Sequence, residues 1–359
     1  MIPLRNRSRA AFFLSVALTF ASATAHAQPK AAKAPKDSSR QSRFTAKTVE
    51  AEQTKFPFNI PRRGSLTLQI QILLDRAGFS PGIIDGEWGI NAAKAVTFFT
   101  KPDDTDRLTG DSPPAVTSID RATYERLRAA ARDKPMLIRY TVSEEDLAGP
   151  FTAVPESVYQ QEKLKCLCYS SPLELFSERF HSSKKLLADL NPRVNLEKLR
   201  KGTVITVPNV EAGNAALPQD TAIIARVIIS KKHYWTHAVD TEGKIIYHFP
   251  STLGAGYDPS PSGDFRVTYV SRDPSFKYQP KLFAEVPDTE PEAKLPAGPN
   301  SPVGVVWMSL SKPHYGIHGT SSPETIGYAN SHGCVRLTNW DVMRVMKWAQ
   351  PGTSVIFRE

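Results

Sequence analysis

The strongest constraint on the fold lies in the last third of the chain, where apolar residues recur with a period of two. The stretches 226–229, 235–239 and 244–249 alternate in this way, and the turn sequence Asp-Thr-Glu-Gly at 240–243 joins the last two. A period of two places successive side chains on opposite faces of a strand, so residues 218–359 are expected to form a mainly-β domain. One helix is expected at about 340–349, capped by Thr338 or Asn339 and stopped by Pro351-Gly352, before a final strand at 354–357.

The beginning of the chain has the composition of an export signal. Three arginines within the first nine residues precede an apolar run at 10–20, and the small-residue sequence Ala-His-Ala ends at position 27. This order is typical of a secretory signal peptide over residues 1–27. No later segment approaches the roughly 20 apolar residues of a membrane-spanning helix. The sequence therefore predicts an exported protein without a transmembrane span, located in the periplasm.

Charge narrows the choice of partners. The formal net charge of +9 falls to about +6 once the three signal-peptide arginines are removed. Exported basic proteins usually meet anionic polymers or membrane surfaces. Because the chain carries no recognition helix and no aromatic-basic sheet motif, we expect no nucleic-acid partner. Residues 28–57 mix basic residues with alanine, proline and serine, which predicts a disordered basic linker.

A helical segment is expected at 58–132. Leu66, Ile70 and Leu73 recur at helical spacing, and two further helices are expected at about 92–99 and 121–131. The loop 81–89, Pro-Gly-Ile-Ile-Asp-Gly-Glu-Trp-Gly, places glycines where tight turns need a positive φ. In its L-Q-x-x-L, G-F/Y, D-G-x-x-G and A-V-x-x-F elements the segment resembles the small three-helix peptidoglycan-binding domain. An unrelated helical domain is the alternative.

The middle segment, 133–212, is expected to be a small α/β unit. Helices are predicted at 172–180 and 184–190 and a strand at 202–208. The L-N-P and G-T-x-I-x-V-P elements resemble a LysM-type glycan-binding fold. Such a fold begins with a strand directly before its first helix, a position that 164–168 occupies here, whereas the Tyr-Thr-Val sequence at 140–142 lies some thirty residues too early. Glycan binding and a purely structural role both stay open.

Cysteine usage singles out one thiol. The chain has three cysteines, and in an oxidising compartment paired cysteines become disulfides. Cys166 and Cys168 flank one leucine, while Cys334 stands far from both, so Cys334 is expected outside any disulfide. Whether Cys166 and Cys168 pair is open, because residues two apart on an extended strand are poorly placed for disulfide geometry.

The surroundings of Cys334 indicate nucleophilic chemistry. A thiol reacts as its thiolate, and His318, sixteen residues earlier, can accept its proton and later return it to a leaving amine. Gly333 leaves room for an approaching carbonyl, and the N–H groups of Gly333 and Cys334 can form an oxyanion hole. The carbonyl of Gly319 can hold the Nδ1 of His318.

Four neighbouring residues complete the candidate site as substrate-binding residues. Arg336, two positions beyond the sulfur on an extended backbone, offers a fixed cation for a carboxylate. His332 and Ser331 shape the loop before Cys334, and Tyr315 begins the same stretch.

Taken together, these motifs closely resemble the L,D-transpeptidase catalytic domain family. The resemblance rests on Ile-His-Gly-Thr at 317–320, Ser-His-Gly-Cys-Val-Arg-Leu at 331–337, Pro-Ser-Gly-Asp-Phe at 261–265, the loop 298–304 and the terminal strand. It implies that Cys334 is the nucleophile and His318 the general base and acid, without a cofactor. It also implies attack on the L-centre of diaminopimelate in a peptidoglycan stem, loss of the terminal D-alanine, and a thioester. The acceptor is left open: a second stem giving a 3-3 cross-link, a wall-anchored lipoprotein, or water, as in an L,D-carboxypeptidase.

The expected fold class is thus α+β and multidomain: a helical domain at 58–132, a LysM-like unit at 133–212 and a catalytic domain at 218–359. Two other readings stay open. One is a zinc hydrolase using His314, His318, His332 and Cys334, although Pro313 and Gly316 argue against the helix that would pair the first two. The other is a non-catalytic scaffold that binds the cell wall and its glycan.

Overall fold

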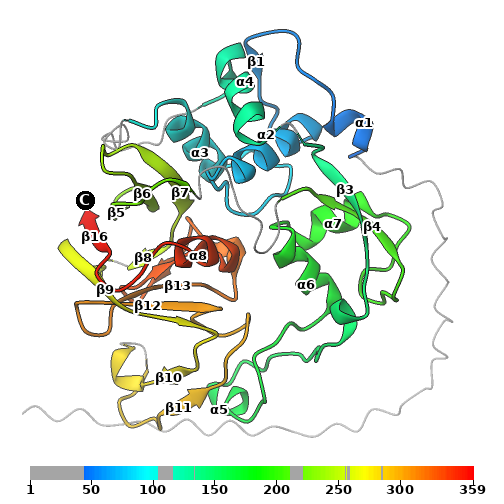
Figure 1. The fold of residues 1–359 in the computed structure, drawn as a ribbon. Coiled ribbons are helices and arrows are strands. Elements are labelled where there is room, and N and C mark those ends of the chain that lie inside the picture. Colours follow the sequence, from blue (N-terminus) through cyan, green and yellow to red (C-terminus); the bar gives the residue numbers. More distant parts are fainter. Residues whose placement is uncertain are drawn as a thin grey trace, which may run out of the picture. The chain divides into compact units, whose positions relative to one another are not determined.

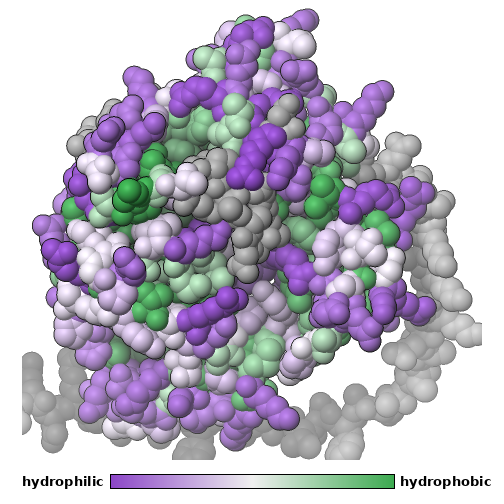
Figure 2. All heavy atoms as spheres, in the orientation of Figure 1, coloured by the Kyte–Doolittle hydropathy of each residue, from purple (hydrophilic) through white to green (hydrophobic). Residues whose placement is uncertain are grey.

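The computed structural model describes residues 44–103, 116–132, 134–210, 221–254, 256, 259–283 and 286–359, which belong to one compact unit, residues 41–359 (Figure 1). The expected signal peptide and most of the expected linker lie outside the described residues. Within the described residues, no helix is long and apolar enough to cross a bilayer. Polar and charged residues cover most of the face drawn in Figure 2, with hydrophobic residues scattered among them.

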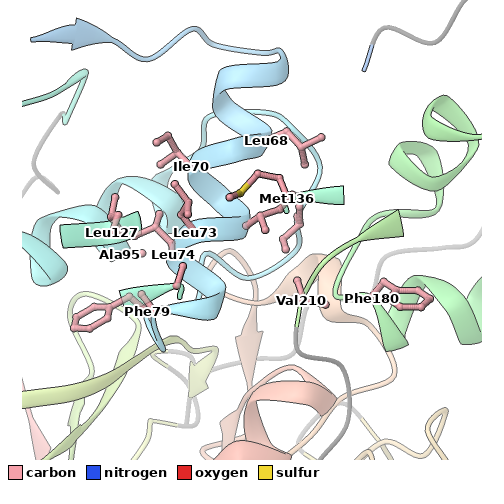
Figure 3. Close-up of a cluster of buried hydrophobic side chains, with 14 of the residues drawn as sticks. Leu68, Ile70, Leu73, Leu74, Phe79, Ala95, Leu127, Met136, Phe180 and Val210 are labelled. Carbon is pink, nitrogen blue, oxygen red and sulfur yellow. The ribbon is translucent and has the colours of Figure 1, made fainter. Parts of the chain in front are cut away.

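Three helices build the core of the helical segment, close to their expected positions. Leu73 and Leu74 of the first helix lie near Ala95 and Leu127 of the other two (Figure 3), and all four are fully buried. A short strand pair closes this segment. The elements are α2 (Ser65–Arg76), α3 (Ile90–Thr100), α4 (Arg121–Ala130), β1 (Phe58–Asn59) and β2 (Ser118–Ile119).

The prediction of a disordered linker over 28–57 is wrong for its described part. Residues Ala46–Val49 form helix α1, which Thr45 caps with a reciprocal hydrogen-bond pair to Thr48. Phe44 and Val49 are buried in the core of the helical segment. The Val49 carbonyl also accepts a hydrogen bond of 2.8 Å from Gln69 Nε2. Burial of these two apolar residues explains why a polar stretch folds here, since a helix this short is unstable alone.

In the middle segment, the expected strand at 202–208 pairs with a strand that lies earlier in the chain than residues 164–168. Tyr140 lies opposite Ile205 in an antiparallel pair, so the early Tyr-Thr-Val stretch is the front strand and 164–168 is not a strand. Residues 142–171 are an insertion relative to the expected order, in which the strand directly precedes the first helix. Such an insertion costs little conformational free energy, because the entropy of loop closure depends only weakly on loop length. The elements are β3 (Leu137–Thr141), η1 (Glu145–Leu147), α5 (Val158–Gln161), α6 (Pro172–Arg179), α7 (Lys184–Leu190) and β4 (Val204–Pro208).

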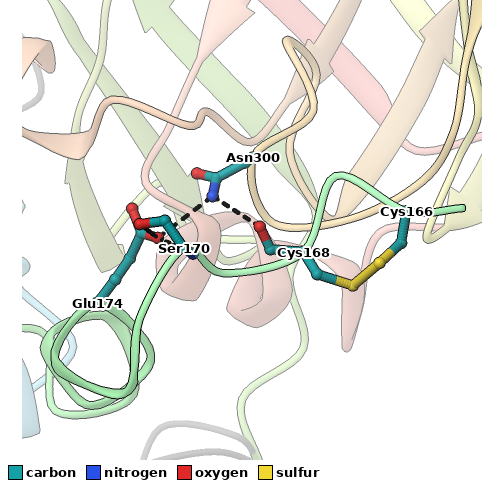
Figure 4. The surroundings of a disulfide bond; sticks show 5 residues. All are labelled: Cys166, Cys168, Ser170, Glu174 and Asn300. Carbon is teal, nitrogen blue, oxygen red and sulfur yellow. Dashed lines mark hydrogen bonds between the residues drawn. A yellow bond between two sulfur atoms is a disulfide. The ribbon is translucent and has the colours of Figure 1, made fainter. Parts of the chain in front are cut away.

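Cys166 and Cys168 form a disulfide in this insertion, with their Cα atoms 5.2 Å apart. Figure 4 shows Asn300 beside it, from the loop 298–304 of the C-terminal domain. Asn300 Nδ2 donates to the Cys168 carbonyl at 2.9 Å and to Glu174 at 3.3 Å. The insertion therefore holds a loop of the C-terminal domain.

The C-terminal domain is mainly β, as expected, and its main sheet has eight strands among the described residues, in the order β15-β13-β12-β9-β16-β5-β6-β7. Helix α8 packs on β12 and β13. The elements are β5 (Arg226–Ser230), β6 (Trp235–Val239), β7 (Ile245–Pro250), β8 (Leu253–Gly254), β9 (Gly263–Arg272), β10 (Phe276–Tyr278), η3 (Pro280–Leu282), β11 (Ala293–Leu295), β12 (Val306–Leu310), β13 (Gly316–His318), η4 (Pro323–Thr325), β14 (Asn330–Ser331), β15 (Val335–Arg336), α8 (Asn339–Met346) and β16 (Ser354–Arg358).

Both faces of this sheet are covered near β5 and β6. Val227 and Ile229 belong to the same hydrophobic cluster as Val342 and Val345 of α8. The alternate residue Ile228 joins the hydrophobic cluster of the helical and middle segments. This two-sided burial explains why every residue of β6 is buried. The three segments expected as domains therefore share one core cluster.

A buried ion cluster also joins the three segments. Arg344 of α8 donates to Asp75 of α2 at 2.8 Å, and His181 of the middle segment lies 2.9 Å from the same carboxylate. Burial alone would raise the pKa of Asp75, but Arg344 and His181 outweigh it and hold that pKa well below its usual range. Burial raises the pKa of the neighbouring Asp341 to about 7. The cluster fixes α8 against the helical segment.

Removing Arg344 should therefore destabilise the whole unit. Arg344→Ala leaves Asp75 as a buried charge without its main partner, and we expect the free energy of unfolding to fall by about 3–5 kcal/mol. Lys201→Ala is the control, because its ion pair with Glu144 is exposed and should be worth less than about 1 kcal/mol. Urea unfolding measures both, and equal effects of the two substitutions would contradict the account.

A second contact covers the sheet edge formed by β7. The Ser80 N–H donates to the His248 carbonyl at 2.8 Å, and the His248 N–H donates to the Gly78 carbonyl at 3.1 Å. The His248 ring lies 2.9 Å from His237, nitrogen to nitrogen, and both side chains are fully buried. Burial, with Lys94 adding to it, lowers the pKa of His248 to about 3. The helical segment therefore protects an edge strand and encloses a neutral histidine pair.

A lowered pKa means that the neutral form of His248 stabilises the fold above pH 6.5 and that this contribution is lost as the pH falls. His248→Gln removes the titrating group. The difference in unfolding free energy between the two proteins should therefore narrow by about 1.4 kcal/mol per pH unit below pH 6.5. Chemical denaturation between pH 7 and pH 5 tests this, and a constant difference would refute it.

Candidate active site

The pairing of β13 with β15 brings the two candidate catalytic residues to neighbouring strand ends. The strands are parallel, with Ile317 opposite Val335 and His318 opposite Arg336. Ile317 and Val335 are fully buried in the core. Alternation then places His318 and Arg336 on the other face. Cys334 directly precedes Val335, in the bend before β15, and alternation continued by one residue places it on the face of Arg336.

His318 is buried and held in one tautomer. Its Nδ1 lies 2.7 Å from the Gly319 carbonyl oxygen, as the sequence analysis expected. A carbonyl only accepts hydrogen bonds, so Nδ1 carries the hydrogen and Nε2 keeps its lone pair. Burial, with the Arg336 charge adding to it, lowers the pKa of His318 to about 3. The ring is therefore neutral at neutral pH, which is the form that can accept a proton.

Trp307 supports the imidazole and was missed by the sequence analysis. It lies opposite His318 on β12, and the two rings stack with centroids 5.3 Å apart and planes 23° apart. A Cβ atom on Gly316 would lie 2.6 Å from the Trp307 ring, so only glycine fits there.

The turn before Cys334 is fixed by two hydroxyl groups. Gly333 has φ +89°, a conformation that favours glycine, and its carbonyl accepts a hydrogen bond of 2.7 Å from Ser260 Oγ. The Cys334 carbonyl accepts one of 2.6 Å from Ser331 Oγ. Because a trans peptide points its C=O and N–H in opposite directions, Ser260 also sets the direction of the Cys334 N–H. Cys334 itself is partly exposed, with Sγ 3.6 Å from the His314 carbonyl.

The remaining candidates differ in what they contact. Ser331 is buried and bonds to the loop itself, while His332 packs its ring edge-on against Phe283 at 4.9 Å. Tyr315 packs against the hydrophobic core of the domain, with the Lys312 ammonium 5.2 Å from its ring centre. The structure thus brings together the loop 331–334 and the strand ends at 318–319 and 336. Tyr315 instead packs against the core.

The geometry also bears on the zinc alternative. His314 lies in the turn before β13 and not on a helix with His318. Within the described ranges, no three His, Cys, Asp or Glu side chains are grouped closely enough to hold a metal ion.

Comparisons with known proteins identify the family of the chain. The family model of the L,D-transpeptidase catalytic domain (YkuD) matches residues 224–357. A putative L,D-transpeptidase of Fuscovulum blasticum is 30% identical over 133 residues, which are 37% of this chain and 67% of that protein. The chain belongs to the L,D-transpeptidase family.

Other family members match a longer stretch. Putative L,D-transpeptidase YkuD of Bacillus licheniformis is 27% identical over 183 residues, covering 51% of this chain and 91% of that protein. Probable L,D-transpeptidase YbiS of Escherichia coli K12 is 30% identical over 194 residues, covering 52% of this chain and 60% of that protein. About half of the chain therefore lies outside the matched regions.

Solved structures of the family are more distant. The crystal structure of L,D-transpeptidase 3 from Mycobacterium tuberculosis is 16% identical and covers 45% of this chain and 77% of that one, with a TM-score of 0.32. An L,D-transpeptidase from Mycobacterium smegmatis covers 45% and 76%, with the same score and identity. At these scores the structural likeness adds nothing to the assignment.

The two kinds of cysteine should react differently. Without reductant, iodoacetamide should add a single group per chain, on Cys334, because Cys166 and Cys168 are joined to each other. After reduction and unfolding, three groups should be added. Mass spectrometry of peptide fragments locates the adducts, and modification of Cys166 or Cys168 in the untreated protein would contradict the disulfide.

Proposed function

We propose that Cys334 is the nucleophile and His318 the general base and acid of an L,D-transpeptidase reaction. The observation that carries the proposal is the parallel pairing of β13 with β15, with His318 held by the Gly319 carbonyl as a neutral imidazole on the Cys334 face. The thiol proton passes to Nε2 as sulfur attacks the substrate carbonyl. His318 then returns the proton to the leaving amine.

The turn at 332–334 supports the charged intermediate in this proposal. The N–H groups of Gly333 and Cys334 would donate to the oxyanion, and each such donor is typically worth about 3–4 kcal/mol of barrier. The Ser260 hydroxyl, bonded to the Gly333 carbonyl, holds that turn in place. Arg336 would bind a substrate carboxylate. His332 and Ser331 shape the loop, and a direct substrate contact by Tyr315 is not part of the proposal because its ring packs against the core.

The substrate we propose is a peptidoglycan stem tetrapeptide, cleaved at the L-centre of diaminopimelate with release of D-alanine. The thioester is then transferred to an amine, either the side chain of a second stem, giving a 3-3 cross-link, or a lipoprotein lysine. The enzyme needs no cofactor for these steps. Export through the signal at 1–27 would place it at the cell wall, where its net positive charge favours the anionic polymer. The helical segment would bind the glycan of that wall.

A stem tetrapeptide fragment tests the proposal. Incubation with purified protein should give a thioester on Cys334, detected by mass spectrometry, and a cross-linked product when an amine acceptor is present. Cys334→Ala should abolish the adduct, and His318→Ala should lower kcat/KM by about 10²–10⁴-fold. Both proteins should unfold at temperatures close to that of the wild type.

Three outcomes would overturn parts of this proposal. Full activity of Cys334→Ser would exclude the nucleophile. An absence of adduct, with no change on Cys334→Ala, would favour a wall-binding scaffold. A hydrolysed stem without any amine product would identify an L,D-carboxypeptidase. Lys201→Ala, a substitution at an exposed position, is the control and should keep wild-type activity.

A further inference from the structure

One peptide unit links His318 to the rest of the molecule. The Gly319 carbonyl accepts the hydrogen bond from His318 Nδ1, and the N–H of the same peptide, that of Thr320, donates to Asn339 Oδ1 at 3.2 Å. A trans peptide is planar, and its C=O and N–H point in opposite directions. Whatever holds the Thr320 N–H therefore aims the Gly319 carbonyl at His318.

Asn339 fits closely between two strands. It is the first residue of α8 and is 2% exposed. Its Oδ1 also accepts from the Val305 N–H at 3.2 Å. A Cβ atom on Gly304 or on Gly319 would lie 2.1 Å or 2.2 Å from this oxygen, so the side chain fits because both positions are glycine. The orientation of Asn339 thus sets the position of the Gly319–Thr320 peptide.

The other end of Asn339 is held by the middle segment. Asn339 Nδ2 donates to Glu178 Oε2 at 2.9 Å and to the Pro299 carbonyl at 3.1 Å. Glu178 lies on α6, 161 residues earlier in the chain. The Tyr169 hydroxyl donates to the second carboxylate oxygen of Glu178 at 2.8 Å. Both carboxylate oxygens of Glu178 therefore accept a hydrogen bond, one from Tyr169 and one from Asn339.

We propose that Glu178 is a positioning residue for the active site: through Asn339 and the Gly319–Thr320 peptide it sets the orientation and tautomer of His318. The middle segment then contributes to catalysis through its helix α6, whether or not it binds glycan. This inference rests on the Cys334–His318 pair proposed above. It assigns to α6 a function that no motif in the middle segment indicates.

Glu178 is partly buried and lies beside polar side chains. A cavity of about 350 Å³ borders it, and the charged or titratable side chains around this cavity are those of Tyr169, Arg179, His181, Arg272, Asp273 and Arg344. Burial raises the pKa of Glu178 to about 7, with Glu174 adding to it. Measurements at pH 8 therefore keep the carboxylate ionised, in the form that accepts from both neighbours.

The test measures Cys334 alone and needs no substrate. The rate of iodoacetamide alkylation of the full, unreduced chain at pH 8 reports attack by the Cys334 sulfur while the neutral His318 ring takes its proton, and His318→Ala gives the rate without this base. Glu178→Leu removes the acceptor and should slow alkylation about 5–10-fold, toward the His318→Ala rate. Glu144→Leu is the matched control in the same middle segment, because the ion pair of this carboxylate with Lys201 is exposed. It should stay within about twofold of the wild type.

An exchange of donor and acceptor tests the contact even if Glu178→Leu does not fold. Asn339→Asp removes the donor and places two carboxylates together, so its alkylation should be slow. Adding Glu178→Gln restores a donor opposite an acceptor, and the double variant should recover at least half of the lost rate. If Glu178 acted only by stabilising the fold, and not through its contact with Asn339, the second substitution would not restore the alkylation rate.

The outcomes separate this inference from the proposed function. The role of Glu178 would be overturned if folded Glu178→Leu were alkylated at the wild-type rate, or if the double variant were alkylated no faster than Asn339→Asp. Either result would leave the proposed catalytic pair intact. If His318→Ala is alkylated as fast as the wild type, the pair itself is refuted.

Discussion

The parallel pairing of β13 with β15 is the interaction on which the active site depends. It places two segments that are separated by a loop side by side, in a register that buries Ile317 and Val335 together. The same register leaves His318, Arg336 and the preceding Cys334 on the opposite face. A shift of one residue would reverse the faces and separate the imidazole from the thiol, so burial of two aliphatic side chains keeps the site aligned.

Support for this pairing comes from outside the catalytic segment. Helix α8 packs on β12 and β13, begins with Asn339, and is held at Arg344 by the buried Asp75 of the helical segment. The middle segment reaches the same helix through Glu178 and holds the loop 298–304 through its disulfide-bearing insertion. Both segments lie outside residues 224–357, which the family model matches, and both contact the structure that holds His318.

Much of the fold was predictable because the local spacing of apolar residues indicates where helices and strands form. The spacing of apolar residues gave α2, α7, β6 and β16 within a few residues, and Thr338 was a recognisable cap of α8. The motifs around His318 and Cys334 predict the site, and the roles of these two residues stay predictions. The pairing of β3 with β4 was not, because an insertion separates that strand from its helix. Helix α1 was missed because it depends on the burial of Phe44 and Val49. Trp307, Ser260 and Glu178 act through strand register and long-range contacts, which no local pattern contains.

The tautomer of His318 is the most direct test of the account, because it decides whether this imidazole can take the proton of Cys334. Nitrogen-15 NMR of the folded protein at neutral pH, with His318 assigned by its substitution, distinguishes the two neutral forms and the imidazolium. The structure predicts a neutral ring with hydrogen on Nδ1. A ring with hydrogen on Nε2, or a doubly protonated ring, would contradict the account.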